Sequence, residues 1–215
     1  AQVSANSFSR GWMRDLFRGN IPIYGIDENS AKLAMGQFDK FRSTALYLAD
    51  LETGKSSLLE RGTRQTRSWM VDRENNPLIR IDRDEDNNKI NFFVKKNKWQ
   101  FLITLEDMWD IRWSLSENQD KLHILGGKLD FSSVLSVSLS DGSTETSLFA
   151  DMDRDASNFV NNRNDQILGV VYGGLKPYTR FIDAKINSAF ERLSKSFPGS
   201  ELGYVSGEDS LEKII

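Results

Sequence analysis

Side chains able to act as a nucleophile or a general base are scarce in this sequence. It contains one histidine, His123, and no cysteine, which excludes a cysteine nucleophile, a zinc–thiolate centre and any site with two imidazoles from this chain. The Gly-x-Ser-x-Gly motif, which presents the serine of α/β-hydrolases, does not occur. His123 lies among apolar residues in 121–125, a pattern typical of a strand, so we predict a packed imidazole rather than a base. We therefore predict no catalytic residue.

Two acidic stretches, 82–88 and 151–155, alternate carboxylates with other residues, as calcium-binding loops do. An EF-hand loop also requires Gly at its sixth position and Glu at its twelfth. These positions hold Asn87 and Phe93 in the first stretch, and Ala156 and Asn162 in the second. Both stretches are therefore predicted to be solvated turns, and we predict neither a metal nor a cofactor.

Arginine and tryptophan side chains are the candidates for binding a substrate. Arg64 and Arg67 belong to an arginine-rich stretch, 61–73, that is expected to form one strand and its turns. Guanidinium groups there could bind a peptide carboxylate through paired hydrogen bonds, or they could be surface charges offset by neighbouring acids. Trp109 lies in a predicted loop, 106–110, and is the aromatic candidate for stacking on a peptide or sugar. The predicted substrate-binding residues are thus Arg64, Arg67 and Trp109.

The length and charge of the chain limit the fold and the partner. Its 215 residues suggest one domain, or one domain plus a fragment. With 28 Lys and Arg against 31 Asp and Glu, the net charge of −3 argues against nucleic acid or an anionic membrane as the main partner. Hydrophobic residues make up 39% of the chain, enough for a packed core. The chain begins Ala1-Gln2 without methionine, a pair that can follow a signal-peptidase cut, so we expect a periplasmic or secreted protein rather than a cytoplasmic one.

An internal repeat organises the chain. Trp69, Trp113 and Phe159 each begin an apolar strand, followed by a polar turn and a second strand, and they are spaced 44 and 46 residues apart. Tyr24 and Tyr204 extend this pattern by 45 residues on either side. A period of about 40–50 residues with four strands per unit is typical of a β-propeller. Trp69 and Trp113 are accordingly expected in the core between blades.

The predicted fold is an all-β propeller with about four to five four-stranded blades over 21–215, and we expect it to be part of a larger ring. Predicted hairpin turns at Gly54 and Gly142 are 88 residues apart, which is two periods of the repeat. A β-sandwich is the alternative, but it would not repeat an aromatic anchor at constant spacing. Residues 212–215 still follow a strand pattern, which favours a longer ring.

Two segments are expected to be helical. Residues 1–20 form an N-terminal segment with a possible short helix over 8–17. A helical insertion is predicted at about 183–196, where Ile186, Phe190 and Leu193 share one face and Asp183 could cap the start.

Several motifs resemble those of a known family. The stretch 50–54, Asp-Leu-Glu-Thr-Gly, is similar to the outer hairpin Asp-Leu-x-Thr-Gly of prolyl-oligopeptidase-family propellers, and 114–122 resembles their blade-start turn. The most specific stretch, 167–199, resembles a helix-bearing insertion of these propellers. The chain, from about 21 to 215, therefore resembles the N-terminal β-propeller of prolyl-oligopeptidase-family serine peptidases, especially the bacterial acylaminoacyl-peptidase-like branch. It departs from the family pattern in that Asn or Glu replaces Pro and Gly in most blade turns.

The resemblance implies a non-catalytic domain that gates peptide access to a hydrolase domain absent from this chain. The partners would be a C-terminal α/β-hydrolase domain of the same polypeptide and short peptides. An incomplete ring would expose strand edges, so a homo-oligomer is also expected. One alternative is a stand-alone propeller that binds a protein or a glycan. A further alternative is a propeller glycosidase with paired carboxylates, for which no pair stands out.

Overall fold

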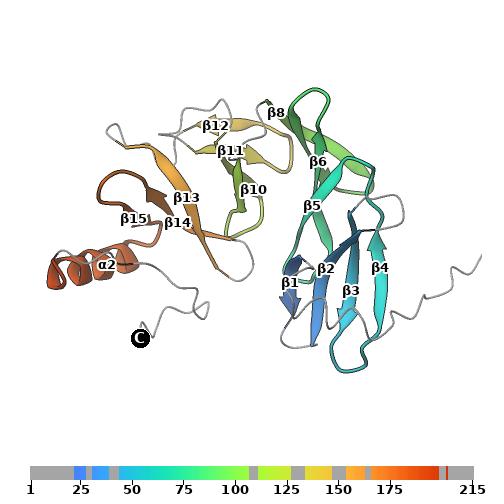
Figure 1. Cartoon of the computed structure of the whole chain (residues 1–215), viewed down its shortest axis with the longest axis horizontal. Helices are drawn as coiled ribbons and strands as arrows, with labels where there is room; N and C mark the ends of the chain where they lie inside the picture. Colours follow the sequence, from blue (N-terminus) through green and yellow to red (C-terminus); the bar gives the residue numbers. More distant parts are fainter. Residues whose placement is uncertain are drawn as a thin grey trace, which may run out of the picture. The chain divides into compact units, whose positions relative to one another are not determined.

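The computed structural model describes residues 22–27, 31–38, 44–106, 111–126, 134–146, 154–162, 166–198 and 202. Within these ranges the chain forms strands β1 to β15 and one helix, α2, and the strands make four antiparallel sheets (Figure 1). The chain divides into two compact units, residues 1–105 and 106–215, which are described separately. None of the helices described is long and apolar enough to cross a membrane.

The first unit contains two four-stranded sheets, coloured blue to green in Figure 1. The first sheet consists of β1 (Ile23–Asp27), β2 (Lys32–Phe38), β3 (Thr44–Asp50) and β4 (Ser56–Glu60). The second consists of β5 (Thr66–Val71), β6 (Pro77–Asp84), β7 (Lys89–Lys95) and β8 (Trp99–Glu106), whose last residue lies at the boundary of the unit.

The second unit contains a four-stranded sheet, a three-stranded sheet and the helix. The four-stranded sheet consists of β9 (Arg112–Leu115), β10 (Lys121–Leu125), β11 (Leu135–Ser138) and β12 (Thr144–Thr146). The three-stranded sheet consists of β13 (Ala156–Asn161), β14 (Ile167–Tyr172) and β15 (Tyr178–Phe181), and α2 (Ala184–Ser196) follows it.

In every sheet the strands lie in the order in which they occur along the chain. Each sheet is therefore an antiparallel meander, the organisation of a propeller blade. In a β-sandwich, strands that follow one another commonly pass from one sheet to the other, and none of the sheets described is built in this way. The prediction of a β-propeller is thus confirmed, with about four blades in the part of the chain that the structure describes.

The sequence period reappears in the turns that join the first two strands of successive blades. Asp72, Ser116 and Asn162 directly follow the first strand of their blades. The side chains of Asp72 and Ser116 each accept two hydrogen bonds from backbone N–H groups of their own turn, and the Asn162 side chain accepts one. These residues are 44 and 46 residues apart. Asn75 and Gln119, 44 residues apart, have positive φ angles of 64° and 56° in two of these turns. The repeat therefore arises because the blades that begin with β5, β9 and β13 each close their first hairpin with a polar side-chain acceptor.

The core of the first unit contains Trp69, which is 1% exposed and packs with Ala34, Leu46 and Val71. The contact joins the first two sheets, since Ala34 and Leu46 come from one and Trp69 and Val71 from the other. The Trp69 indole Nε1–H donates a hydrogen bond to the Thr44 carbonyl oxygen at 2.9 Å. The prediction that Trp69 lies between blades is confirmed, whereas Trp113 is only half-buried.

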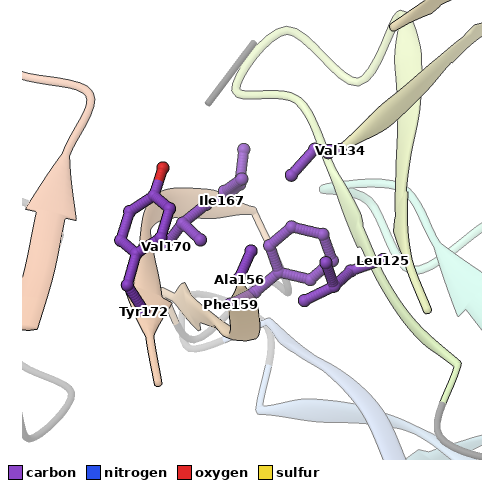
Figure 2. Close-up of a cluster of buried hydrophobic side chains, with 7 residues drawn as sticks. All are labelled: Leu125, Val134, Ala156, Phe159, Ile167, Val170 and Tyr172. Atoms are coloured by element: carbon purple, nitrogen blue, oxygen red, sulfur yellow. The ribbon is translucent and has the colours of Figure 1, made fainter. Parts of the chain in front are cut away.

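A corresponding cluster fills the second unit (Figure 2). Phe159, the third repeat anchor, is buried there with Leu125 and Tyr172. The remaining members of the cluster are Val134, Ala156, Ile167 and Val170. The two sheets of this unit are thus also joined by apolar side chains placed by the repeat.

Helix α2 is attached to β15 by specific contacts. The Asp183 carboxylate accepts hydrogen bonds from the backbone N–H groups of the first turn, so it is the N-cap, as expected from the sequence. Asn187 Oδ1 accepts a hydrogen bond from the Phe181 N–H, and the Phe181 and Phe190 rings meet edge to face at 5.1 Å. The apolar face of the helix is half-buried. The predicted N-terminal helix, 8–17, and the anchor Tyr204 lie outside the described residues.

Candidate functional site

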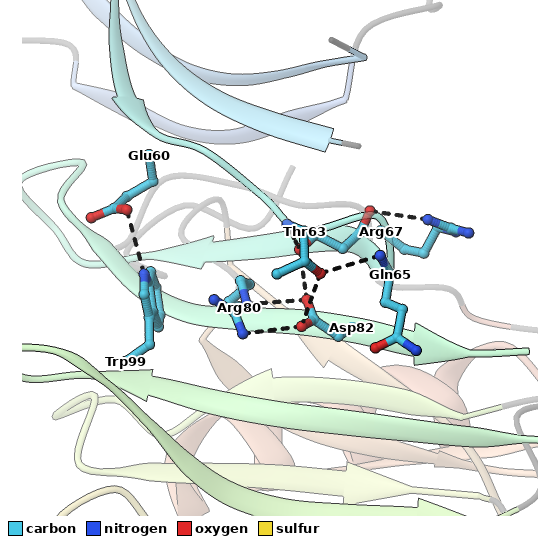
Figure 3. A network of polar contacts seen from close by, with 8 residues as sticks. Glu60, Thr63, Gln65, Arg67, Arg80, Asp82 and Trp99 are labelled. Atoms are coloured by element: carbon cyan, nitrogen blue, oxygen red, sulfur yellow. Dashed lines mark hydrogen bonds and ion pairs between the residues drawn. The ribbon is translucent and has the colours of Figure 1, made fainter. Parts of the chain in front are cut away.

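A buried polar network occupies the start of the second blade (Figure 3). Asp82 on β6 is 3% exposed and lies at its centre. Its carboxylate accepts hydrogen bonds from Thr66 Oγ1 at 2.6 Å and from Thr63 Oγ1 at 3.3 Å. Arg80 donates from Nε at 3.1 Å and forms an ion pair through Nη2 at 3.0 Å. Four donor contacts therefore satisfy this carboxylate.

Arg80 is equally well enclosed. Its side chain is 12% exposed, and its guanidinium lies over the rings of Phe93, at 4.4 Å, and Trp99, at 5.3 Å. A charge held between a carboxylate and two rings has its interactions already satisfied. The network is suited to fixing β5 against β6 and not to binding a ligand.

The acidic stretch 82–88 begins in β6, which ends at Asp84, and only residues 85–88 form the exposed turn. The prediction of a solvated turn is therefore confirmed for 85–88 and wrong for Asp82, which is buried because Thr66 and Arg80 bind its carboxylate. Asp84 accepts hydrogen bonds from the N–H and the side-chain amide of Asn87, and Asp82 belongs to the buried network. The carboxylates of Asp82 and Asp84 are therefore occupied by hydrogen bonds from neighbouring residues of the same blade. Within the described ranges, no group of three or more His, Cys, Asp or Glu side chains is arranged to hold a metal ion.

The structure brings Arg64, in the turn that leads into β5, close to Arg67, the second residue of β5. Arg67 donates from Nη1 to the Arg64 carbonyl oxygen at 2.8 Å and pairs through Nη2 with Glu85 at 3.2 Å. Arg64 is exposed, and its guanidinium has no partner among the residues described. Arg64 is thus the arginine whose side chain remains open to a carboxylate, and substrate binding by both residues stays a prediction. Trp109 lies outside the described residues.

His123 pairs with a residue that the sequence analysis did not identify. It lies on β10 directly opposite Ser136 on β11, and its Nδ1 is 2.9 Å from Ser136 Oγ. A histidine beside a serine hydroxyl is one element of an activated nucleophile. Both residues are buried, however, at 4% and 2% exposure, which leaves no access for a substrate. Burial, with a smaller effect of the Lys121 charge, lowers the pKa of His123 to about 4, so the imidazole is neutral at pH 7. The packed imidazole that we predicted is confirmed.

The second unit contains a groove between β15 and α2 with a volume of about 780 Å³. Its walls include four cationic side chains, Arg154, Lys176, Arg180 and Lys195, and one acidic side chain, Glu191. Tyr178 and Phe190 contribute aromatic surface. The sequence does not indicate this groove, because its cations are scattered over 154–195 and come together only where α2 packs beside β15.

Comparison with known proteins adds structural relatives. No protein-family model matches the sequence, and no curated protein matches it. The solved structures to which the chain is similar include an acylaminoacyl peptidase in complex with Z-Gly-Gly-Phe-chloromethyl ketone, with 15% identity and a TM-score of 0.49 over 76% of this chain. They also include the β-propeller domain of the trilobed protease from Pyrococcus furiosus, with 16% identity and a TM-score of 0.46 over 76% of this chain. The tricorn protease is a third, with 13% identity and a TM-score of 0.40 over 66% of this chain.

The chain corresponds to only part of each of these proteins. It spans 31% of the acylaminoacyl peptidase chain, 56% of the trilobed protease chain and 14% of the tricorn protease chain. The blade assignment itself rests on the sheet order of this chain.

Proposed function

We propose that this chain is a non-catalytic propeller domain of a serine peptidase of the prolyl oligopeptidase family. The observation that supports this most directly is the order of elements in 167–199, where a blade ends in β15 and continues into a capped helix. This is the stretch whose sequence resembles the helix-bearing insertion of the family most specifically. The chain contains no Gly-x-Ser-x-Gly motif, so the reaction would take place in a C-terminal α/β-hydrolase domain of the same polypeptide.

The role of the propeller would be to gate the active site. A domain that covers the site admits short peptides and excludes folded chains by size. It also removes bulk water from the reacting groups, which strengthens electrostatic interactions there. Arg64, whose guanidinium has no partner among the described residues, would bind the carboxylate of an entering peptide, and Arg67 would support the turn that presents it.

The test compares this chain with a polypeptide that continues from it into the proposed hydrolase domain. We expect the longer polypeptide to hydrolyse a chromogenic aminoacyl substrate and to be blocked by a serine-directed inhibitor, and we expect this chain alone to be inactive. We also expect the longer polypeptide to cleave short peptides and to spare folded proteins. Hydrolysis by this chain alone, or a reading frame that continues without Gly-x-Ser-x-Gly, would refute the proposal.

The role of Arg64 is tested separately in the longer polypeptide. The Arg64→Gln substitution should raise KM for peptides about fivefold and leave kcat unchanged, which corresponds to losing about 1 kcal/mol of binding. Arg61→Gln is the matched control, because Arg61 is an exposed arginine of the same segment. If the two substitutions raise KM equally, Arg64 does not bind the peptide carboxylate.

A further inference from the structure

The groove between β15 and α2 has an excess of positive charge that the protein itself does not neutralise. Among the residues described, no carboxylate forms an ion pair with Lys176, Arg180 or Lys195. The acidic side chain of the groove, Glu191, is engaged on its own helix, because its Oε1 accepts a hydrogen bond from Asn187 Nδ2 at 2.8 Å. The groove is therefore electropositive, although the chain as a whole carries a net charge of −3.

One of these cations is held in place before any ligand arrives. Arg154 donates a hydrogen bond from Nη1 to the Lys176 carbonyl oxygen at 2.6 Å. Its guanidinium carbon lies 5.0 Å from the centroid of the Tyr178 ring. These two contacts use only part of the guanidinium, which has five N–H donors. An ordered arginine with free donors loses little entropy when it binds a carboxylate.

The aromatic rings of the groove are already engaged with other side chains. Tyr178 stacks on Tyr172 at 4.8 Å, with 12° between the ring planes, and also lies under Arg154. Phe190 packs edge to face on Phe181. A nucleic acid would need exposed ring faces on which to stack its bases and a longer basic track for its phosphates. The groove fits a short ligand with carboxylates and apolar side chains better.

We propose that the groove between β15 and α2 binds an acidic peptide segment. Arg154, Arg180 and Lys195 would contact its carboxylates. The parts of Tyr178 and Phe190 that stay accessible beside their contacts with Tyr172 and Phe181 would contact its apolar side chains. A volume of about 780 Å³ is within the range of ligand-binding pockets. The groove lies entirely in the second unit, so peptide binding there can be tested whether or not a hydrolase domain follows in the polypeptide.

The test is fluorescence anisotropy with the whole chain and a fluorescein-labelled peptide of sequence Glu-Leu-Glu-Glu-Leu-Glu. The matched peptide Gln-Leu-Gln-Gln-Leu-Gln has the same length and apolar side chains but lacks the carboxylates. We expect the acidic peptide to bind, the neutral peptide not to bind, and the affinity to fall as salt is added. The double substitution Arg180→Gln and Lys195→Gln should weaken binding about tenfold, since each removes a charge-assisted contact.

The control variant is Arg61→Gln with Lys55→Gln, which removes the same two charges from exposed positions of the first unit. It should bind the acidic peptide as the unmodified chain does. The four substituted side chains are exposed, so both variants should remain folded. The proposal is overturned if the two variants bind alike, if the neutral peptide binds as well as the acidic one, or if a labelled oligodeoxythymidine binds more tightly than either peptide.

Discussion

Arg80 and Asp82 lie two residues apart on β6 and form an ion pair in which Arg80 Nη2 is 3.0 Å from Asp82 Oδ2. Alternate residues of a strand face the same side of a sheet, so this spacing places both charges on one face. Thr66, directly opposite Asp82 on β5, completes the network with a hydrogen bond. The pair is thus tied to the register of the first hairpin in the second blade.

The first prediction concerns this network. Asp82→Leu removes the acceptor of four donor contacts and leaves the Arg80 guanidinium buried without its carboxylate. Breaking a buried pair from one side is strongly destabilising, so we expect the free energy of unfolding to fall by about 3 kcal/mol. Urea denaturation followed by circular dichroism would measure it. The control is Glu145→Gln, which breaks the exposed pair of Glu145 with Lys121 and should leave the midpoint unchanged. Equal effects would show that Asp82 contributes no more than a surface charge.

The second prediction concerns the contact between the first two blades. Trp69→Phe reduces the buried volume and leaves the Thr44 carbonyl oxygen without its indole donor. We expect a loss of about 2 kcal/mol in unfolding free energy, which combines the cavity with an unsatisfied buried acceptor. Trp113→Phe changes the corresponding anchor of the next repeat, where the side chain is only half-buried, and should have a smaller effect in the same urea titration. A larger effect at Trp113 would contradict the packing seen here.

The blades could be predicted from the sequence because their determinants are local. The acceptors Asp72, Ser116 and Asn162 each close a turn with hydrogen bonds to residues no more than five positions away. The helix was equally accessible, since Asp183 caps a segment whose apolar residues follow the helical period. Such features depend on short-range chemistry that a single sequence displays.

The features that escaped the sequence analysis depend on contacts between distant residues. Ser136 faces His123 only because β10 and β11 pair in one particular register. Arg154 meets Tyr178 across a separation of 24 residues, and nothing in the intervening sequence indicates that they converge. The sequence predicts Asp82 in a solvated turn with its acidic neighbours. It is buried instead, because a hydrogen bond from Thr66 and an ion pair with Arg80 satisfy its carboxylate. Contacts between distant strands thus decide which charged and polar side chains are buried and which are brought together.

The third prediction is a pH dependence of stability that arises from His123. The pKa of this residue is lowered from 6.5 to about 4 in the folded protein, chiefly by burial. Between these two values the unfolded chain binds more protons than the folded chain, so stability falls as the pH falls. Its contribution is fully present above pH 6.5 and is lost below about pH 4. The total change is on the order of 3 kcal/mol.

This pH dependence can be isolated with His123→Gln, which keeps a hydrogen-bonding side chain opposite Ser136 and does not titrate. Urea midpoints measured from pH 4 to pH 7 should fall more steeply in the unmodified protein than in the variant. Acidic groups with lowered pKa values contribute equally to the pH dependence of the urea midpoint in both proteins. One example is Asp141, whose pKa is lowered to about 2 by hydrogen bonds from Ser143. Parallel curves for the two proteins would show that His123 titrates normally in the folded state.

The fourth prediction concerns the helix that forms one wall of the groove. Asp183→Ala removes the side-chain acceptor of the Lys185 and Ile186 N–H groups and should destabilise the start of α2 by about 1 kcal/mol. Because the helix is anchored to β15 through Asn187 and Phe190, we expect local fraying and not loss of the blade. Amide hydrogen exchange should therefore be about fivefold faster in the first turn of the helix and unchanged in β14. Ser188→Ala, at an exposed position of the same helix, should leave both rates unchanged. Faster exchange across β14 as well would mean that the cap holds the whole blade together.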